Sequence, residues 1–347
     1  MIKVGILGAT GYVGSELIRI LYNHPEVEIK ALSSQKHNNQ VYNSIYENFN
    51  KICDMKCEEY ELDLLANQLD VIFLALPHGV SSKIISEKSL RQVKVIDLSA
   101  DFRLKTEETY EEWYNDKHHN KNLLKTAVYG LCEWKRSEIN TARLIANPGC
   151  YPTCILLCLL PLVKEGLIDF DGIIIDAKSG VSGAGRSLNL ATIFTECNET
   201  IKAYSIVSHR HTPEIEQQLS EIHGKDIKVI FTPHLVPMNR GILCTCYANL
   251  SKLYSFDEIK QVFEKYYKKE FFIRLTKKGI FPETKWVKGS NYCDIGFTID
   301  KRTGKIIIIG AVDNLIKGAA GQAVQNMNLM FNLEENMGLK SIPMFPV

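Results

Sequence analysis

One cysteine of this chain lies where a thiol could act as a nucleophile. The segment 146–153 reads Ala-Asn-Pro-Gly-Cys-Tyr-Pro-Thr and follows an apolar run, 142–146, that is typical of a strand. Pro148 fixes one backbone angle and Gly149 permits an unusual one, so the pattern predicts a sharp turn with Cys150 at its tip. The apolar run after the motif predicts a buried helix. Because a helix start favours the thiolate, we interpret Cys150 as a covalent nucleophile rather than as a small buried apolar residue.

Two histidines could move protons for this cysteine. His209 and His211 flank an arginine, and Thr212 and Pro213 then predict the N-cap and first turn of a helix. An extended segment before that helix would place both rings on the same side. A single histidine is more often structural, whereas two beside a helix start are typical of a site. The sequence therefore indicates both as candidate bases.

A glycine-rich turn near the amino terminus is typical of a dinucleotide site. An apolar strand at 3–7 precedes the turn, a helical pattern at 15–21 follows it, and a second strand is predicted at 27–32. Glycines let the backbone approach a pyrophosphate, whose charge lies at the helix N-terminus. The residues predicted to bind the cofactor here are Gly8, Thr10, Gly11, Tyr12, Val13 and Gly14.

The end of the second strand favours NADP over NAD. An NAD-selective site usually has Asp or Glu there to bind the ribose 2′-hydroxyl. This chain instead continues with Ser33, Ser34, Gln35 and Lys36. Hydroxyls and a cation suit a 2′-phosphate, so we expect Ser33, Ser34 and Lys36 to bind NADPH, with an ordinary polar loop as the alternative.

Two further strands end in residues that would border a ligand. In an open parallel sheet the carboxyl ends of the strands line the ligand crevice. The strand predicted at 70–76 leads into Pro77, His78 and Gly79, which are expected to line the cofactor pocket. The strand at 93–99 leads into Asp101 and Arg103, which could pair on the surface, although Arg103 is also a good anion ligand. Residues 104–128 are expected to form a solvated excursion.

A loop dense in glycine and hydroxyls follows the strand predicted at 172–178. The run 179–186 is compatible with a flexible linker or with a cradle for an anion. We favour a substrate loop, since Lys178 precedes it and Arg186 ends it.

Composition narrows the class of protein. The 347 residues suggest two domains, and 45% hydrophobic and 23% charged residues are ordinary for a soluble globular protein. A net charge of +1 gives no reason to expect nucleic acid or an anionic membrane as partner. The ten cysteines show no zinc-site spacing, so no metal is expected, and they suit a reducing cytoplasm. No apolar run resembles a signal segment or a membrane span, so we expect a cytoplasmic protein.

The order of the elements predicts an α/β protein of two domains. Residues 1–149 would form a Rossmann-like domain that binds NADP. Residues 150–314 would form an α+β domain for catalysis and dimerisation, with a mostly antiparallel or mixed sheet. Small residues from 313 to 323 open a helix, and the segment 315–347 is expected to complete the first domain.

Five motifs together resemble the N-acetyl-γ-glutamyl-phosphate reductases of arginine biosynthesis, which are related to aspartate-semialdehyde dehydrogenases. They are Gly-Ala-Thr-Gly-Tyr-Val-Gly at 8–14, Leu-Ser-Ala-Asp-Phe-Arg at 98–103, Asn-Pro-Gly-Cys-Tyr-Pro-Thr at 147–153, His-Arg-His-Thr-Pro-Glu-Ile at 209–215 and Asn-Leu-Ile-Lys-Gly-Ala-Ala-Gly-Gln-Ala at 314–323.

The resemblance implies a reaction and a set of roles. Cys150 would attack the acyl phosphate of N-acetyl-glutamyl 5-phosphate and expel phosphate, and the thioester would take hydride from NADPH to give the semialdehyde. His211, which is nearer the helix start, is favoured over His209 for proton transfer. A homodimer or homotetramer is implied. Substrate ligands would be Arg103, Asn147, Lys178 and Arg186, and further cofactor ligands Ser182, Gly183, Asn314 and Lys317.

Three other functions remain open from the sequence. A cysteine hydrolase or acyltransferase would use Cys150 with His211 but leave the dinucleotide turn without a purpose. A non-catalytic NADP-sensing protein would not need the cysteine and both histidines. Aspartate-semialdehyde dehydrogenase would differ mainly in a substrate without the N-acetyl group.

Overall fold

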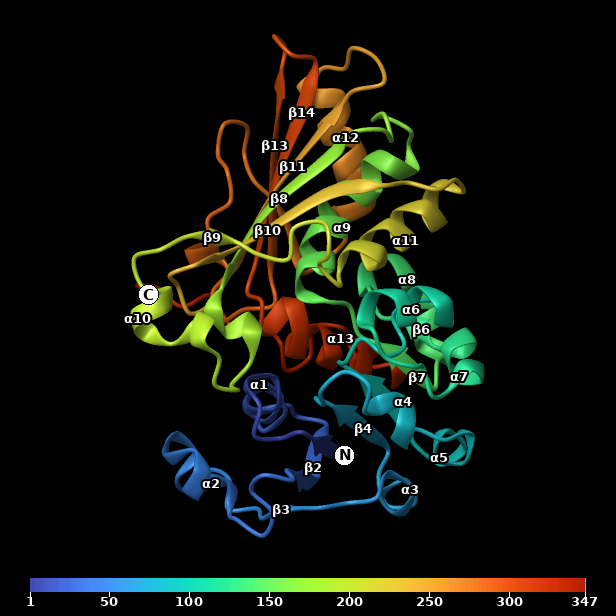
Figure 1. The fold of residues 1–347 in the computed structure, drawn as a ribbon, viewed down its shortest axis with the longest axis vertical. Helices are drawn as coiled ribbons and strands as arrows, with labels where there is room; N and C mark the ends of the chain where they lie inside the picture. Colours follow the sequence, from blue (N-terminus) through green and yellow to red (C-terminus); the bar gives the residue numbers. More distant parts are fainter. Residues whose placement is uncertain (347) are drawn as a thin grey trace. The chain divides into compact units, whose positions relative to one another are not determined.

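The chain forms two compact units in a computed structural model that describes residues 1–346 (Figure 1). The first unit consists of Met1–Pro148 and Ala319–Lys340, and the second of Gly149–Gly318 and the residues from Ser341. The segment 315–347 is therefore divided between the units. Its last residues are held in the second unit, where the Met344 N–H donates to the Lys288 carbonyl at 2.9 Å.

The first unit contains a seven-stranded sheet in the order β3-β2-β1-β4-β5-β7-β6, and every neighbouring pair is parallel. The order reverses at β1, which creates the switch point at which such sheets bind ligands. Strand β4 is buried along its whole length, as expected for a parallel strand covered on both faces. The predicted α/β class is confirmed. The strands are β1 (Ile2–Leu7), β2 (Val27–Ser33), β3 (Cys57–Glu58), β4 (Val71–Leu74), β5 (Lys94–Asp97), β6 (Val128–Tyr129) and β7 (Leu144–Ala146).

The turn after β1 needs glycine for close backbone approach. Gly8 has φ +86°, and a Cβ there would lie 2.2 Å from the Ala75 carbonyl oxygen. A Cβ on Gly14 would lie 2.3 Å from the Gly8 carbonyl oxygen. The glycines therefore let the turn fold tightly against β4 and the start of α1, as the motif predicted.

The segment 104–128 corrects the expected solvated excursion, because it forms α6, α7 and β6. Thr106 and Asn120 cap the two helices by accepting the N–H groups of Thr109 and Leu123. Tyr110 is wholly buried, but few of its neighbours in the sequence are apolar. The spacing of apolar residues therefore did not predict the helices. The helices of this unit are α1 (Tyr12–Leu21), α2 (Tyr42–Ile45), η1 (Glu47–Phe49), α3 (Leu62–Leu65), α4 (Ser81–Ile84), α5 (Glu87–Gln92), α6 (Glu107–Tyr114), α7 (Lys121–Thr126), α8 (Cys132–Thr141) and α13 (Gly321–Met330).

The second unit contains a seven-stranded mixed sheet in the order β12-β13-β14-β11-β8-β10-β9. The pairs β8–β10 and β12–β13 are parallel, and the others are antiparallel. This confirms the predicted mostly antiparallel or mixed sheet. The strands are β8 (Ile173–Gly180), β9 (Lys202–Ala203), β10 (Val229–Val236), β11 (Ile242–Asn249), β12 (Ile273–Leu275), β13 (Cys293–Asp300) and β14 (Lys305–Val312).

Helices cover one face of this sheet, and Figure 1 shows α9, α11 and α12 on the same side of it. Helix α9 is buried from Tyr151 to Val163, so it forms the centre of the core. Gly310 of β14 lies beneath it, since a Cβ there would meet the sulfurs of Cys154 and Cys158 at 2.8 and 2.5 Å. The helices are α9 (Cys150–Lys164), η2 (Val181–Ala184), η3 (Leu190–Thr192), α10 (Phe194–Cys197), α11 (Thr212–His223), α12 (Phe256–Tyr267), η4 (Thr284–Trp286) and the π-helix η5 (Ile316–Ala320). Among residues 1–346, no helix is long and apolar enough to cross a membrane.

Candidate active site

The predicted nucleophile, Cys150, is the first residue of helix α9. Its N-cap, Gly149, is extended and offers no side chain to the helix start. Cys150 is partly exposed, whereas the next thirteen residues are buried. The structure therefore places the thiol at the accessible, positive end of an otherwise buried helix, where an anion is favoured.

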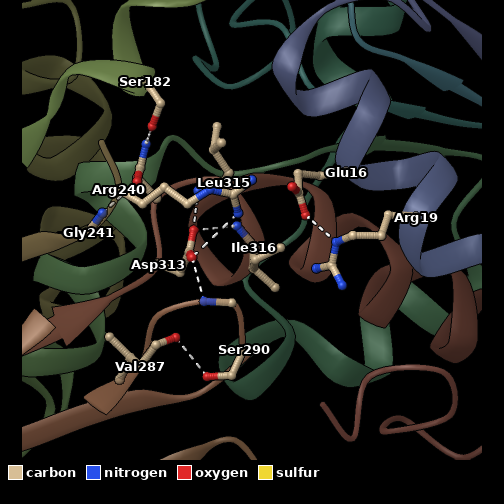
Figure 2. Close-up of polar contacts among 12 residues, drawn as sticks. Glu16, Arg19, Ser182, Arg240, Gly241, Val287, Ser290, Asp313, Leu315 and Ile316 are labelled. Carbon is tan, nitrogen blue, oxygen red and sulfur yellow. Dashed lines mark hydrogen bonds and ion pairs between the residues drawn. The ribbon is translucent and has the colours of Figure 1, made fainter. Parts of the chain in front are cut away.

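The small residues near residue 318 let a second backbone approach this cysteine. A Cβ on Gly318 would lie 2.9 Å from the Cys150 Cβ and 3.2 Å from its Cα. Gly318 belongs to η5, whose first turn is held by Asp313: Oδ1 accepts the N–H groups of Leu315 and Ile316 at 2.9 and 3.2 Å (Figure 2). The sequence indicated a segment of small residues here but gave no sign that its neighbour is Cys150.

The structure brings both candidate histidines to the start of α9. The ring centroids of His209 and His211 are 4.9 Å apart, and the Tyr151 ring lies 5.7 and 6.1 Å from them. The segment before α11 is a turn, in which the Ser208 N–H donates to the Ser205 carbonyl, and not the extended stretch that alternation suggested. The N-cap of α11 is His211, one residue earlier than predicted.

His209 is held in one hydrogen-bonding state. The His211 N–H donates to His209 Nδ1 at 3.1 Å. Burial, followed by the charge of Arg210, lowers the pKa of His209 to about 4. The imidazole is therefore neutral at neutral pH, and because Nδ1 accepts, Nε2 carries the proton.

Two tyrosines complete the surroundings of these rings as neutral groups. The Tyr204 hydroxyl donates to the Tyr151 hydroxyl at 3.3 Å, and the latter donates to the His234 carbonyl at 3.3 Å. Burial raises the pKa of Tyr204 to about 12, and burial also raises the pKa of Tyr151. Neither phenol can supply negative charge to the site at neutral pH.

Three of the predicted cofactor residues lie together in the second unit. Asn314 Nδ2 donates to Ser182 Oγ at 3.0 Å, and Asn314 Oδ1 accepts the Gly241 N–H at 2.8 Å (Figure 2). A Cβ on Gly183 would lie 3.8 Å from Asn314 Nδ2. Asn314 therefore fixes the glycine-rich loop after β8 to the turn before β11. The fourth, Lys317, is fully buried, with Nζ 5.7 Å from the centroid of the Phe272 ring.

The two predicted substrate cations of this unit are Lys178, in β8, and Arg186, in the loop that follows η2. Lys178 pairs across the sheet with Leu243, whereas its neighbour Ala177 pairs with Cys244, which lies under α9. Because paired residues share a face, Lys178 points to the face opposite α9, and there its Nζ lies 2.7 Å from Asp176 Oδ2. Arg186 lies on the exposed loop that follows η2.

In the first unit the glycine-rich turn meets the end of β2. The N–H groups of Gly8 and Ala9 donate to the Ser33 carbonyl at 3.0 and 2.9 Å. Thr10 Oγ1 and Ser34 Oγ are 2.7 Å apart, and Lys36 is exposed on the loop that follows. The residues predicted to bind the pyrophosphate and the ribose phosphate are thus adjacent. Gly8 and Gly14 leave no room for a Cβ beside the backbone of Ala75 and Gly8, so the turn closes tightly at the start of α1, as a dinucleotide-binding turn requires.

Asp101 ties together the loops after β4 and β5. Its carboxylate accepts the N–H groups of Gly79 at 2.7 Å and Ser82 at 2.9 Å, and the Tyr110 hydroxyl at 3.0 Å. The Ala100 N–H donates to His78 Nδ1 at 3.0 Å. Asp101 is fully buried, so the suggested surface pairing with an arginine is wrong. His78 and Pro77 are exposed on the loop after β4, at the carboxyl end of the parallel sheet.

Arg103 and Asn147, both predicted substrate ligands, also meet in the first unit. Arg103 Nε donates to the Asn147 carbonyl at 2.8 Å, and Nη2 donates to the Leu98 carbonyl at 2.9 Å. The Asn147 amide donates to the Ala319 carbonyl at 3.2 Å and accepts from Asn326 at 3.1 Å. Both side chains are therefore buried and hold the strand ends in place.

Sequence reasoning missed one charged residue beside the nucleophile. Glu214, in the first turn of α11, is 1% exposed, and its Oε1 accepts the Gly149 N–H at 2.8 Å. An acidic residue in a first helical turn is a common capping signal for its own helix. Its bond to another helix depends on tertiary packing and has no local signal.

Two family models match the two parts of the chain. Residues 3–142 match the NAD binding domain of semialdehyde dehydrogenases, and residues 150–314 match the semialdehyde dehydrogenase dimerisation domain. The second match begins at Cys150.

Similar proteins cover the whole chain. An N-acetyl-gamma-glutamyl-phosphate reductase of Lachnoclostridium phytofermentans is 55% identical over 346 residues, and one of Lachnospira eligens is 54% identical over 348; each match covers 100% of both chains. Among solved structures, an aspartate semialdehyde dehydrogenase with NADP from Candida albicans has a TM-score of 0.69 at 19% identity, covering 96% of this chain and 99% of that one. That likeness shows the fold.

The depressed pKa of His209 predicts a pH-dependent stability. Unfolded His209 takes up a proton near its ordinary pKa of 6.5, but the folded residue does so only near 4. Since the unfolded state then binds more protons, the free energy of unfolding should fall as the pH is lowered through this window. Urea unfolding of the wild type and of His209→Gln at a series of pH values measures the effect. The variant should lose less stability over the window, and equal losses would contradict the assignment.

Proposed function

Because the chain belongs to the N-acetyl-gamma-glutamyl-phosphate reductase family, we propose that it reduces N-acetyl-L-glutamyl 5-phosphate to N-acetyl-L-glutamate 5-semialdehyde and phosphate, with NADPH, in arginine biosynthesis. The observation that carries the proposal is the position of Cys150 at the start of α9, with both histidine rings beside the adjoining Tyr151. A hydrolase would need the same groups but not the glycine-rich turn after β1.

In the proposed reaction, the Cys150 thiolate attacks the acyl carbon, the sulfur–carbon bond forms and the bond to the phosphate oxygen breaks. A thioester and free phosphate result. When bound, NADPH supplies a hydride, which reduces the thioester carbonyl carbon. The hemithioacetal then collapses to the aldehyde and regenerates the thiolate. Dividing the reaction at the thioester replaces one difficult displacement with two easier steps.

We assign proton transfer to His211 and an orienting role to His209. His209 Nδ1 is occupied by the His211 N–H, and its neutral ring presents Nε2 as a donor. Because Nδ1 is occupied and Nε2 carries a proton, His209 is suited to donate a hydrogen bond to an oxygen of the substrate and not to accept the thiol proton. His211, at the N-cap of α11, is then the candidate to receive the proton from Cys150 and return it to the hemithioacetal oxygen.

For the phosphate and carboxylate of the substrate, we retain Arg186 and Arg103 as candidate ligands. Arg186 is exposed on a glycine-rich loop, so it can move toward an anion. Arg103 lies in the loop after the parallel strand β5, and its planar guanidinium matches the geometry of an oxyanion. Lys178 is a weaker candidate, because it faces away from α9 and pairs with Asp176.

We propose that the second unit forms a homodimer through the face of its sheet opposite α9. This unit matches a dimerisation domain. On that face Ile174 and Ile230 are 39% and 58% exposed, although they lie in regular strands. Exposed apolar side chains on one face of a sheet are typical of a surface that packs on another chain. The ten thiols also favour a reducing compartment, and we propose the cytoplasm.

The functional test runs the reaction backward, from N-acetyl-glutamate semialdehyde, phosphate and NADP, while NADPH absorbance is followed. NADPH should form only when phosphate is present, because phosphate must release the acyl group from Cys150. Aspartate semialdehyde serves as the comparison substrate. NADPH formation from aspartate semialdehyde alone would indicate an aspartate-semialdehyde dehydrogenase instead. No NADPH formation from either substrate would overturn the proposal.

NADP selectivity is proposed to depend on Lys36, the exposed cation after β2. Lys36→Ala should raise the KM for NADPH about 10- to 100-fold, since a hydrogen bond to a charged group contributes about 1.5–3 kcal/mol, and should leave the KM for NADH unchanged. Steady-state kinetics with both cofactors measures this. Lys30→Ala, an exposed lysine of β2 paired with Glu28, is the matched control and should behave as wild type. An unchanged KM for NADPH in the Lys36 variant would contradict the assignment.

A further inference from the structure

The two helices that carry the proposed catalytic groups are joined at their starts by one carboxylate. Glu214 lies in the first turn of α11, and its Oε1 accepts the N–H of Gly149, the N-cap of α9. The N–H···O distance is 2.8 Å, and both residues are buried. Helices α9 and α11 also pack against each other along their lengths.

Glu214 accepts the backbone N–H of the N-cap residue, the part that a Glu or Gln of the same helix plays in a capping box. An N-cap residue usually accepts a hydrogen bond through its own side chain, and glycine has none. The Gly149 carbonyl is already fixed from inside the helix, because the Thr153 N–H and Thr153 Oγ1 both donate to it at 2.9 Å. With its N–H held by Glu214, Gly149 is constrained on both sides. The backbone that leads into Cys150 therefore has little freedom to rotate.

The same carboxylate belongs to the turn that carries the proposed base. His211 is the N-cap of α11, three residues before Glu214. The bond therefore links the first turn of α11, which His211 caps, to the residue that precedes Cys150. Displacement of a reacting group by about 1 Å can reduce a rate about 100-fold.

We infer that Glu214 is a positioning residue for the proposed acyl transfer: as a hydrogen-bond acceptor it holds Gly149, and so presents the Cys150 thiol to His211. The inference rests on the proposed function. The acceptor oxygen, rather than the negative charge, is what the role requires. An anion beside the start of α9 even opposes the field that favours the thiolate.

Three substitutions of Glu214 separate the need for an acceptor oxygen from the need for a negative charge. Glu214→Gln keeps an acceptor oxygen at the same reach without the charge, Glu214→Asp keeps the charge but shortens the side chain, and Glu214→Ala removes both. The matched control is Glu216→Ala on the same helix. The Glu216 carboxylate accepts the Val229 N–H at 3.1 Å and contacts Lys228 at 3.2 Å, away from α9.

The measurement is kcat and KM for the forward or reverse reaction, with thermal unfolding of each variant. Glu214→Asp and Glu214→Ala should lower kcat about 10- to 100-fold with little change in KM, because the thiol is misplaced and substrate binding is not. Glu214→Gln should restore kcat to near the wild-type value, and Glu216→Ala should retain it. If the alanine variant does not fold, the Gln and Asp variants decide.

Wild-type kcat in Glu214→Asp would overturn the inference, and so would a loss in Glu214→Gln as large as in Glu214→Asp, which would show that the charge matters. If Glu216→Ala lowered kcat to the same extent, the loss would reflect the general stability of α11 and not the position of the thiol. That result would also overturn the inference. These results differ from failure of the proposed function, in which the wild-type protein itself would not turn over the substrate.

Discussion

The second unit depends on how the backbone is held where helix α9 begins. Gly149 is bonded through its N–H to Glu214 and through its carbonyl to Thr153, while Gly318 packs against Cys150 with no space for a side chain. All of these contacts involve main-chain atoms, so they constrain the position of the thiol directly. The helix that follows is buried from Tyr151 to Val163, which makes this point rigid.

The first unit is also held by backbone contacts at glycine and by a buried carboxylate. Its glycine-rich turn brings the backbone of Gly8 within contact of Ala75, and Asp101 binds the N–H groups of the loop after β4. A buried carboxylate that accepts backbone N–H groups therefore organises a loop in each unit. Glycine permits the close approach of two backbone segments, and the carboxylate then holds the loop in that position.

Much of this arrangement was predictable from sequence because it is local. The strand, turn and helix around Gly8 and the helix that begins at Cys150 follow from glycine, proline and the spacing of apolar residues within short stretches of sequence. The helix α6 escaped prediction, because Tyr110 is its one buried residue and its sequence therefore has no apolar period. The roles of Glu214, Asp101 and Gly318 were not accessible, because each depends on a partner more than 20 residues away.

The most direct test of the account is to trap the acyl enzyme. The protein is mixed with N-acetyl-glutamyl 5-phosphate without NADPH, digested at low pH and analysed by mass spectrometry. The account predicts one N-acetylglutamyl group on the peptide that contains Cys150, released by hydroxylamine and absent from Cys150→Ala. An acyl group on another cysteine, or turnover by Cys150→Ala, would contradict the claim that this thiol is the nucleophile.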